Sequence, residues 1–236
     1  STSQMHSLYL TYDGKAYGSG YGGMYMLGSP NTSYRNLCLP IRHSGGNQLS
    51  DIVQVNAGYY GSFFVNNSGN VYTCGYNYYY SLNYRSGWNY IYYPTLVQFS
   101  NGSVLSDVIQ VCSSYYYSTA FLTSSGKVYG QGYNIYYKFG RNYSNYYLQQ
   151  LFGGNNLPKI ISIQHNYYNL KMIAVDGKVY GCGYSYYGSL GHRIGVNSYA
   201  NDPILIQIYN SNDLSNIIQI SSSRKEGSWY ISSNGK

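Results

Sequence analysis

Residues 107–140 read DVIQVCSSYYYSTAFLTSSGKVYGQGYNIYYKFG, and the order of features in this stretch decides the fold. A β-branched run with alternating polarity at 107–111 is followed by an apolar run at 118–122, and both are typical of short strands. Ser125-Gly126 then forms a two-residue turn before a third run at 127–129. Because glycine supplies the positive φ of a tight hairpin, the second and third runs are expected to pair antiparallel.

The same order of features recurs along the chain. Runs like the one at 107–111 start at residues 51, 159 and 216, so that the period is 52 to 57 residues. Equivalent turns stand at Asp13-Gly14, Ser68-Gly69, Asp176-Gly177 and Asn234-Gly235. A Leu-Gly or similar pair, a polar loop and a final strand, often after a proline, complete each unit, which therefore holds about four short strands.

A four-stranded unit with this period predicts an all-β protein, namely a β-propeller whose tandem blades are the repeats. An open β-solenoid is the alternative, although its coils are usually shorter. We expect one repeat domain over residues 1–236, with units at 1–50, 51–106, 107–158 and 159–215 and a partial unit at 216–236. Four and a half repeats fit either a part of a larger array or an open one.

The stretch 107–140 and the stretch DGKVYGCGYSYYGSLG at 176–191 resemble the repeat of the regulator-of-chromosome-condensation family. The resemblance lies in the Gly-x-Val-Tyr hairpin, the Gly-x-Asn that follows it and the Gly-x-Leu-Gly close. The family's tryptophan in this hairpin is replaced by Ser19, Cys74, Gln131 and Cys182. The resemblance implies a propeller, usually of seven blades, so this chain would be a fragment of a longer array or would close or polymerise with its neighbours.

Composition narrows the class of protein. Charged residues make up only 9% of the chain, whereas tyrosine accounts for 36 of its 236 residues. Such an aromatic content excludes a disordered chain. The net charge of +7 could attract nucleic acid, but no basic run longer than Arg224-Lys225 is present, so nucleic acid is not an expected partner. No apolar run is long enough to predict a membrane span.

No residue pattern points to catalysis. The seven acidic residues form no close pair for acid–base chemistry, and the four histidines are scattered. We therefore expect no enzymatic activity, no cofactor and no metal site. The four cysteines lack metal-binding spacing and are interpreted as buried free thiols or, in a secreted protein, as one or two disulfides.

Tyrosine clusters in two loop positions of each unit. The cluster between the first two strands comprises Tyr59, Tyr60, Tyr115, Tyr116, Tyr117, Tyr167 and Tyr168. The cluster after the Gly-Tyr pair comprises Tyr78, Tyr79, Tyr136, Tyr137, Tyr186 and Tyr187. Corresponding loops of a propeller share a face, so these rings are expected to form a rigid contact surface. Arg85, Arg141 and Arg193 recur nearby and could stack on the rings as cation–π pairs.

These features favour a non-enzymatic structural or interaction protein whose tyrosine loops contact other proteins, most simply further copies of itself in a homo-oligomer, fibre or coat. A lectin-like propeller that binds glycans is the first alternative. An intracellular exchange-factor or chromatin-type module is the second, and it rests on the resemblance alone.

The location is predicted from the sequons and the composition. Four Asn-x-Ser sequons, at Asn31, Asn66, Asn101 and Asn142, are candidate glycosylation sites. Together with the low charge and the phenolic side chains, they predict an extracellular or surface protein.

Overall fold

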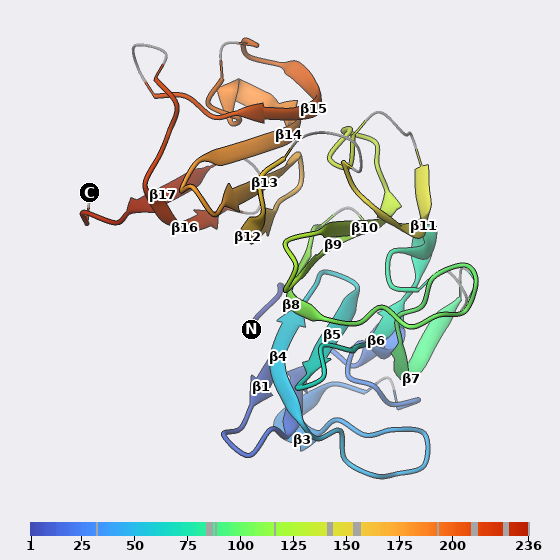
Figure 1. Ribbon diagram of the computed structural model, residues 1–236. Coiled ribbons are helices and arrows are strands. Elements are labelled where there is room, and N and C mark those ends of the chain that lie inside the picture. Colours follow the sequence, from blue (N-terminus) through green and yellow to red (C-terminus); the bar gives the residue numbers. More distant parts are fainter. Residues whose placement is uncertain are drawn as a thin grey trace.

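The sheets of the protein follow one another along an arc (Figure 1). The structure is a computed structural model that describes residues 1–31, 33–83, 87, 89–115, 117–140, 144–152, 157–192, 194–208, 212–223 and 227–235. The first strand of each four-stranded sheet lies on the inside of the arc and the last strand on the outside (Figure 1). A membrane-crossing helix is absent from the part of the chain that is described.

Three sheets have four antiparallel strands in simple sequential order. They are β4 (Ile52–Ala57), β5 (Gly61–Asn66), β6 (Val71–Tyr76) and β7 (Tyr90–Leu96); β8 (Val108–Ser113), β9 (Ser118–Thr123), β10 (Val128–Tyr133) and β11 (Ser144–Gln150); and β12 (Ile160–His165), β13 (Asn169–Ala174), β14 (Val179–Ser185) and β15 (Ser198–Leu205). The first sheet contains β1 (His6–Leu10), β2 (Ala16–Gly20) and β3 (Arg35–Pro40), and the last contains β16 (Ile217–Ser222) and β17 (Ser228–Ser232). The prediction of an all-β chain of tandem four-stranded units is confirmed.

Three of the two-residue turns join their sheet to the next one through a backbone hydrogen bond. The carbonyl oxygen of Gly69, in the turn between β5 and β6, accepts a hydrogen bond from the Val108 amide of β8 at 3.0 Å. Gly14 and Gly177 make the same bond to the amides of Ile52 and Ile217, at 2.9 and 3.0 Å. These turns, which the Asp-Gly and Ser-Gly pairs predicted, therefore have two roles. Each closes a hairpin, and each also accepts a hydrogen bond from the first strand of the next blade.

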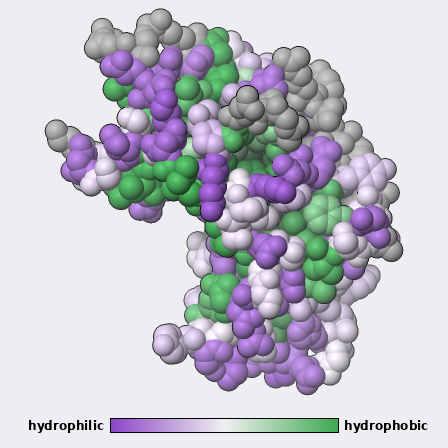
Figure 2. All heavy atoms as spheres, in the orientation of Figure 1, coloured by the Kyte–Doolittle hydropathy of each residue, from purple (hydrophilic) through white to green (hydrophobic). Residues whose placement is uncertain are grey.

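Apolar side chains fill the space between blades. Phe63 of β5 and Phe121 of β9 are fully buried and meet edge to face, with ring centroids 6.2 Å apart. A β-bulge near the start of the inner strands turns one β-branched residue outward in each case, and these exposed residues are Val53, Ile109, Ile161 and Ile218. Figure 2 shows apolar side chains gathered along the concave edge of the arc, over β12 and β16.

Three of the four cysteines are buried free thiols, which is the first of the two interpretations that their spacing allowed. Cys74 and Cys182 fill two of the places where the family has tryptophan, and their thiols donate to the Met26 and Ala200 carbonyls at 3.5 and 3.2 Å. Burial raises the pKa of Cys74, Cys112 and Cys182 to about 12. Cys38 lies exposed on β3, and no disulfide forms.

Thiol titration is expected to separate these two environments. Because the thiolate is the reactive species and three thiols are buried, Ellman's reagent should react rapidly with one thiol per native chain, and with all four in guanidinium chloride. A Cys38→Ser variant should lose the rapid phase. Rapid reaction of a second thiol would contradict the packing described around Cys74, Cys112 and Cys182.

Candidate functional site

The tyrosine loops lie at one end of the blades. Because consecutive strands are antiparallel, the loops β4–β5, β8–β9 and β12–β13 lie at the same end as the loops that follow β6, β10 and β14. The two-residue turns lie at the opposite end. The two predicted loop positions are thus brought onto one face of the molecule.

The rings on this face form a continuous set of contacts, which we call the tyrosine layer. Its members are Tyr59, Tyr60, Tyr76, Tyr78, Tyr79, Tyr115, Tyr117, Tyr133, Tyr136, Tyr137, Tyr167, Tyr168, Tyr184, Tyr186, Tyr187 and Tyr199. It includes the described candidate tyrosines of both loop positions and adds Tyr76, Tyr133 and Tyr184 of the Gly-Tyr pairs and Tyr199 of β15.

Contacts within the layer cross from blade to blade. Tyr60 stacks on Tyr117 of the next blade with centroids 4.8 Å apart and ring planes 3° apart. Tyr59 contacts Tyr115 at 3.9 Å, and Tyr115 reaches Tyr167 of the following blade at 5.9 Å. Ring stacking and edge contacts of this kind stabilise a defined arrangement beyond the area that they bury. The layer therefore spans three consecutive blades as one packed surface.

Rings of the layer are half-buried, and Tyr187 is 68% exposed. Burial raises the pKa of Tyr117 well above its ordinary value, and a hydrogen bond with Tyr60 adds to the effect. Burial likewise raises the pKa of Tyr76. These two hydroxyls stay protonated at physiological pH, so the layer can offer neutral donors and acceptors beside broad apolar ring surface.

Several backbones in the layer are held in a conformation that tyrosine disfavours. Tyr79, Tyr117, Tyr137 and Tyr187 have positive φ values of 52°, 44°, 55° and 47°. Tyr79 and Tyr187 lie in the short 3₁₀ turns η2 (Tyr78–Tyr80) and η4 (Tyr186–Gly188), and a third turn is η1 (Gly23–Tyr25). A left-handed backbone costs a non-glycine residue roughly 1–2 kcal/mol. Residues held in such strained conformations often cluster at active sites and binding sites.

Two asparagines fix the loops that carry the outer tyrosines. The Asn77 side-chain oxygen accepts from the amides of Leu82 and Asn83 at 2.8 and 3.0 Å, and its side-chain nitrogen donates to the Gly87 carbonyl at 2.5 Å. In the next unit the side-chain oxygen of Asn134 accepts the equivalent hydrogen bond from the Phe139 amide, at 3.0 Å. Sequence reasoning missed this role, although its signal was visible, because Asn directly follows the Gly-Tyr pair in both units.

Some predicted site residues fall outside the described part of the chain. They are Tyr116, Arg85, Arg141, Arg193 and the sequon residue Asn142. The cation–π pairing that was expected of the three arginines stays a prediction.

The three other sequons form one kind of turn. The side-chain oxygen of Asn31 accepts from the Ser33 amide at 2.9 Å, and Asn101 accepts from Ser103 in the same way at 2.9 Å. Asn66 repeats the pattern with the Ser68 amide at 3.2 Å. An asparagine that binds the amide two residues on is a common turn former. Turn chemistry is therefore one reason for these Asn-x-Ser patterns, and glycosylation of Asn31, Asn66 and Asn101 stays a prediction.

A cluster of polar side chains lies buried between the third and fourth blades. The Ser118 hydroxyl is 2.7 Å from the Lys138 amine and 3.5 Å from Nε2 of His165. All three side chains are buried, so a substrate could not reach them from solvent. Elsewhere among the described residues, no group of His, Cys, Asp or Glu could hold a metal ion. The cluster is structural.

Comparison with known proteins identifies the repeat. Residues 68–121 and 176–225 match the model of the Regulator of chromosome condensation (RCC1) repeat, and residues 52–80 match a second model of that repeat. Together these segments cover just over half of the chain. The chain belongs to the RCC1 repeat family. A search of curated protein sequences gave no match.

Solved structures, among them yeast RCC1, share the fold. Human WBSCR16 is 21% identical with a TM-score of 0.67, over 92% of this chain and 54% of its own. Prp20p from Saccharomyces cerevisiae, reported with its binding properties to Gsp1p and histones, is 16% identical with a TM-score of 0.72, over 96% and 53%. Yeast RCC1 (Prp20), in a structure with Kap60 bound to it, is 15% identical with a TM-score of 0.70, and the match covers 98% of this chain and 53% of the other. The chain spans about half the length of these proteins.

The prediction of an extracellular or surface location is wrong. The RCC1-type structures that share this fold include a histone-binding protein of yeast, and histones are found inside the cell. The prediction rested partly on sequons, and turn chemistry is one reason for the three that are described. Self-assembly into a fibre and glycan binding gain no support from the family or from these structures.

Proposed function

We propose that this RCC1-type chain is a non-enzymatic protein-interaction module that works inside the cell, and that the tyrosine layer is its binding face. The supporting observation is the continuity of the layer, in which ring contacts join Tyr59 and Tyr60 of one blade to Tyr115 and Tyr117 of the next and onward to Tyr167. A set of rings that served only to pack one blade would have no need to continue across three.

Physical chemistry supports a protein as the ligand. Tyrosine and arginine are enriched among the residues that dominate binding energy at protein interfaces. Tyrosine also loses little side-chain entropy when it is fixed, and here neighbouring rings have already fixed it. The strained backbone at Tyr79 and Tyr187 keeps these rings at the surface before a partner arrives. Such preorganisation strengthens binding because less ordering remains to be done.

Charge restricts the class of partner. The chain carries 14 basic and 7 acidic residues, so its field favours a partner with an acidic surface. Prp20p is reported to bind both Gsp1p and histones, and a partner in either role is a candidate here. Histones are strongly basic, so the charge of this chain disfavours them. We therefore favour an exchange-factor type of contact with an acidic protein over a chromatin contact.

Replacing rings of the layer by asparagine is expected to abolish partner binding without unfolding the protein. Asparagine tolerates the left-handed backbone of Tyr79 and Tyr187 and removes only the ring. In affinity capture from the native cells, the double variant Tyr79→Asn/Tyr187→Asn should lose the partners of the wild type, by at least about tenfold for two anchor rings.

Tyr12→Asn is the matched control. Tyr12 is fully exposed in the turn between β1 and β2, at the opposite end of the blades, and it belongs to no described ring pair. This variant should retain the partners. The proposal fails if the double variant stays folded by circular dichroism and captures the same proteins as the wild type.

A further inference from the structure

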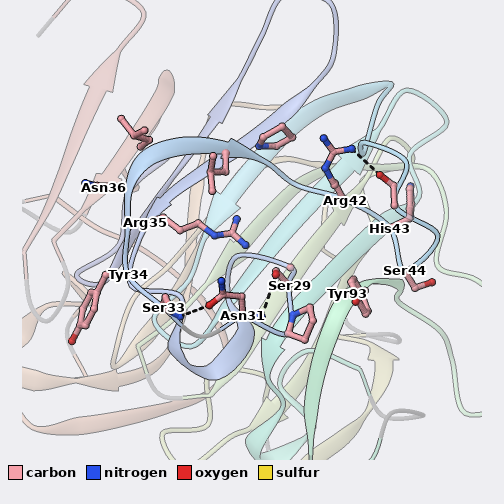
Figure 3. A pocket seen from close by; sticks show the side chains of 16 residues that line it. Ser29, Asn31, Ser33, Tyr34, Arg35, Asn36, Arg42, His43, Ser44 and Tyr93 are labelled. Atoms are coloured by element: carbon pink, nitrogen blue, oxygen red, sulfur yellow. Dashed lines mark hydrogen bonds between the residues drawn. The ribbon is translucent and has the colours of Figure 1, made fainter.

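A groove lies between the outer strands of the first two blades and shares no residue with the tyrosine layer. Its volume is about 680 Å³, a size at which ligand sites commonly occur. One wall is β3 with the loops on either side of it, and Tyr93 of β7 stands on the other wall. Figure 3 shows Arg35 extending into the groove, with Arg42 and His43 at its far end.

The groove has positive charge and no compensating negative charge. Two guanidinium groups and an imidazole line it, and none of its described lining residues carries a carboxylate. Arg42 donates to the Gly46 carbonyl at 2.7 Å, and Arg35 makes one long bond of 3.4 Å to the Leu27 carbonyl. Among the described residues, neither arginine forms an ion pair. Since a guanidinium carries five N–H donors, most of those on Arg35 and Arg42 are available to an anionic ligand.

Apolar surface lies between the two charges. Leu37 and Leu39 are 69% and 44% exposed and line the groove. Leu39 pairs with Gly18 and Arg35 pairs with Gly20, which lie two positions apart on β2, so Arg35 and Leu39 share one side of the sheet. β3 is also the last strand of its sheet, in the order β1-β2-β3, so no strand in the described part of the chain pairs with its outer edge. Charge, apolar surface and a free edge thus follow one another along a single strand.

We propose that this groove binds an extended acidic peptide segment of another protein, with carboxylates on Arg35 and Arg42 and apolar side chains on Leu37 and Leu39. The two arginines are seven positions apart in sequence, and the irregular β2–β3 register between Arg35 and Leu39 makes their separation shorter than the roughly 23 Å of a straight strand. A single small anion would engage one of them, whereas a peptide with acidic residues seven positions apart would engage both. Addition of an extended peptide to a free strand edge is an established mode of recognition.

The test uses isothermal titration calorimetry with the whole chain and two peptides. The probe acetyl-ETVTVTTE-amide has two glutamates seven positions apart, and acetyl-QTVTVTTQ-amide removes only the charges. We expect the glutamate peptide to bind about tenfold or more tightly than the glutamine peptide, with an affinity that falls as salt is raised, because charge-assisted hydrogen bonds are lost or screened. Equal binding of the two peptides, or binding of neither, would overturn the proposal.

Variants of the chain show whether the peptide binds in this groove. Competition with phosphate shows whether the groove is a peptide site or a simple anion site. Arg42→Gln, at an exposed position, should weaken the glutamate peptide about fivefold or more, and Arg35→Gln should act in the same direction if it folds. Lys127→Gln makes the same charge change on an exposed residue of the third blade and should have no effect. Inorganic phosphate that displaces the peptide at equal concentration would overturn the proposal. Because the tyrosine layer is not involved, failure here leaves the proposed function intact.

Discussion

Gly75→Ala is expected to destabilise the protein by about 3–5 kcal/mol, the range of the most damaging single substitutions. Gly75 has a φ of +129°, and an added Cβ would lie 2.4 Å from the Tyr60 carbonyl oxygen and 2.7 Å from the Gly61 Cα. Both obstacles are backbone atoms, one in Gly61 at the start of the paired strand β5 and one in Tyr60 just before it, so relief of the clash requires the β5–β6 pairing to open. Urea unfolding followed by circular dichroism measures the change.

Gly46→Ala is the matched control for this prediction. Gly46 also has positive φ, +86°, but an added Cβ would meet no atom within 4 Å. Alanine there should cost only the conformational penalty of a left-handed residue, about 1–2 kcal/mol. A loss at Gly75→Ala no larger than that at Gly46→Ala would show that the close packing of β5 against β6 is wrong.

Stability is expected to rise between pH 6 and pH 8 by about 2–4 kcal/mol, as the pKa shifts of buried basic groups require. Lys138 is fully buried against the hydroxyls of Ser114 and Ser118 and faces His165, with no carboxylate among these partners. Burial lowers the pKa of Lys138 from 10.5 to about 7 and that of Lys171 to about 8. Burial also lowers the pKa of His6 to about 4 and that of His165 well below 6.5.

The sign follows from proton counts. Between pH 6 and pH 8 the unfolded chain holds protons on these groups that the folded protein has released, so the free energy of unfolding increases with pH. Above about pH 8.5, where ordinary thiols begin to ionise, the effect reverses. Burial raises the pKa of Cys74, Cys112 and Cys182 in the folded protein to about 12, so they keep protons that the unfolded chain loses. The two buried lysines continue to add stability above pH 8 until ionisation of the three thiols in the unfolded chain outweighs them, so the maximum of stability should lie at about pH 8.5 to 9, above that of most proteins.

The Lys138→Met variant measures how much Lys138 contributes to the rise in stability between pH 6 and pH 8. Methionine fills similar volume without charge, so the variant should be more stable than the wild type at pH 6, and its gain between pH 6 and pH 8 should be smaller by about 1 kcal/mol. Lys127→Met, at an exposed position, should leave the slope unchanged. Urea midpoints at a series of pH values provide the comparison. An unchanged slope in Lys138→Met would mean that this lysine is not buried as a titrating group.

The fold could be predicted from the sequence because its local signals agree with one another. The glycines of the recurring Gly-Tyr pairs pack closely against backbone, because a Cβ added to Gly20, Gly132 or Gly183 would lie 2.2–2.7 Å from the carbonyl oxygen of the residue just before the paired strand. The two-residue turns and the repeat period point to the same architecture. Their contacts with the next blade were not predictable, because hairpin chemistry says nothing about a neighbouring sheet.

The site was predicted only in part. Tyrosine in two loop positions was visible in the sequence, but the positive φ of Tyr79 and Tyr187 was not, since tyrosine has no propensity for that conformation. Lys171 occupies a core position that is equivalent in register to Leu8 and Phe63, and composition could not reveal a buried lysine. The sequons misled for a physical reason, because Asn-x-Ser serves both as a glycosylation signal and as a turn.

Site-specific photo-crosslinking is the most direct test of the proposed interaction face. p-Benzoylphenylalanine, which is close to tyrosine in shape, would replace Tyr187 in the tyrosine layer in one protein and Tyr12 at the opposite end in another, and both would be irradiated in the native cells. Both positions are exposed, so solvent access does not distinguish them. Discrete crosslinks to a partner protein from position 187 and none from position 12 are predicted. Crosslinks to the partner from position 12 alone would contradict the assignment of the tyrosine layer as the binding face.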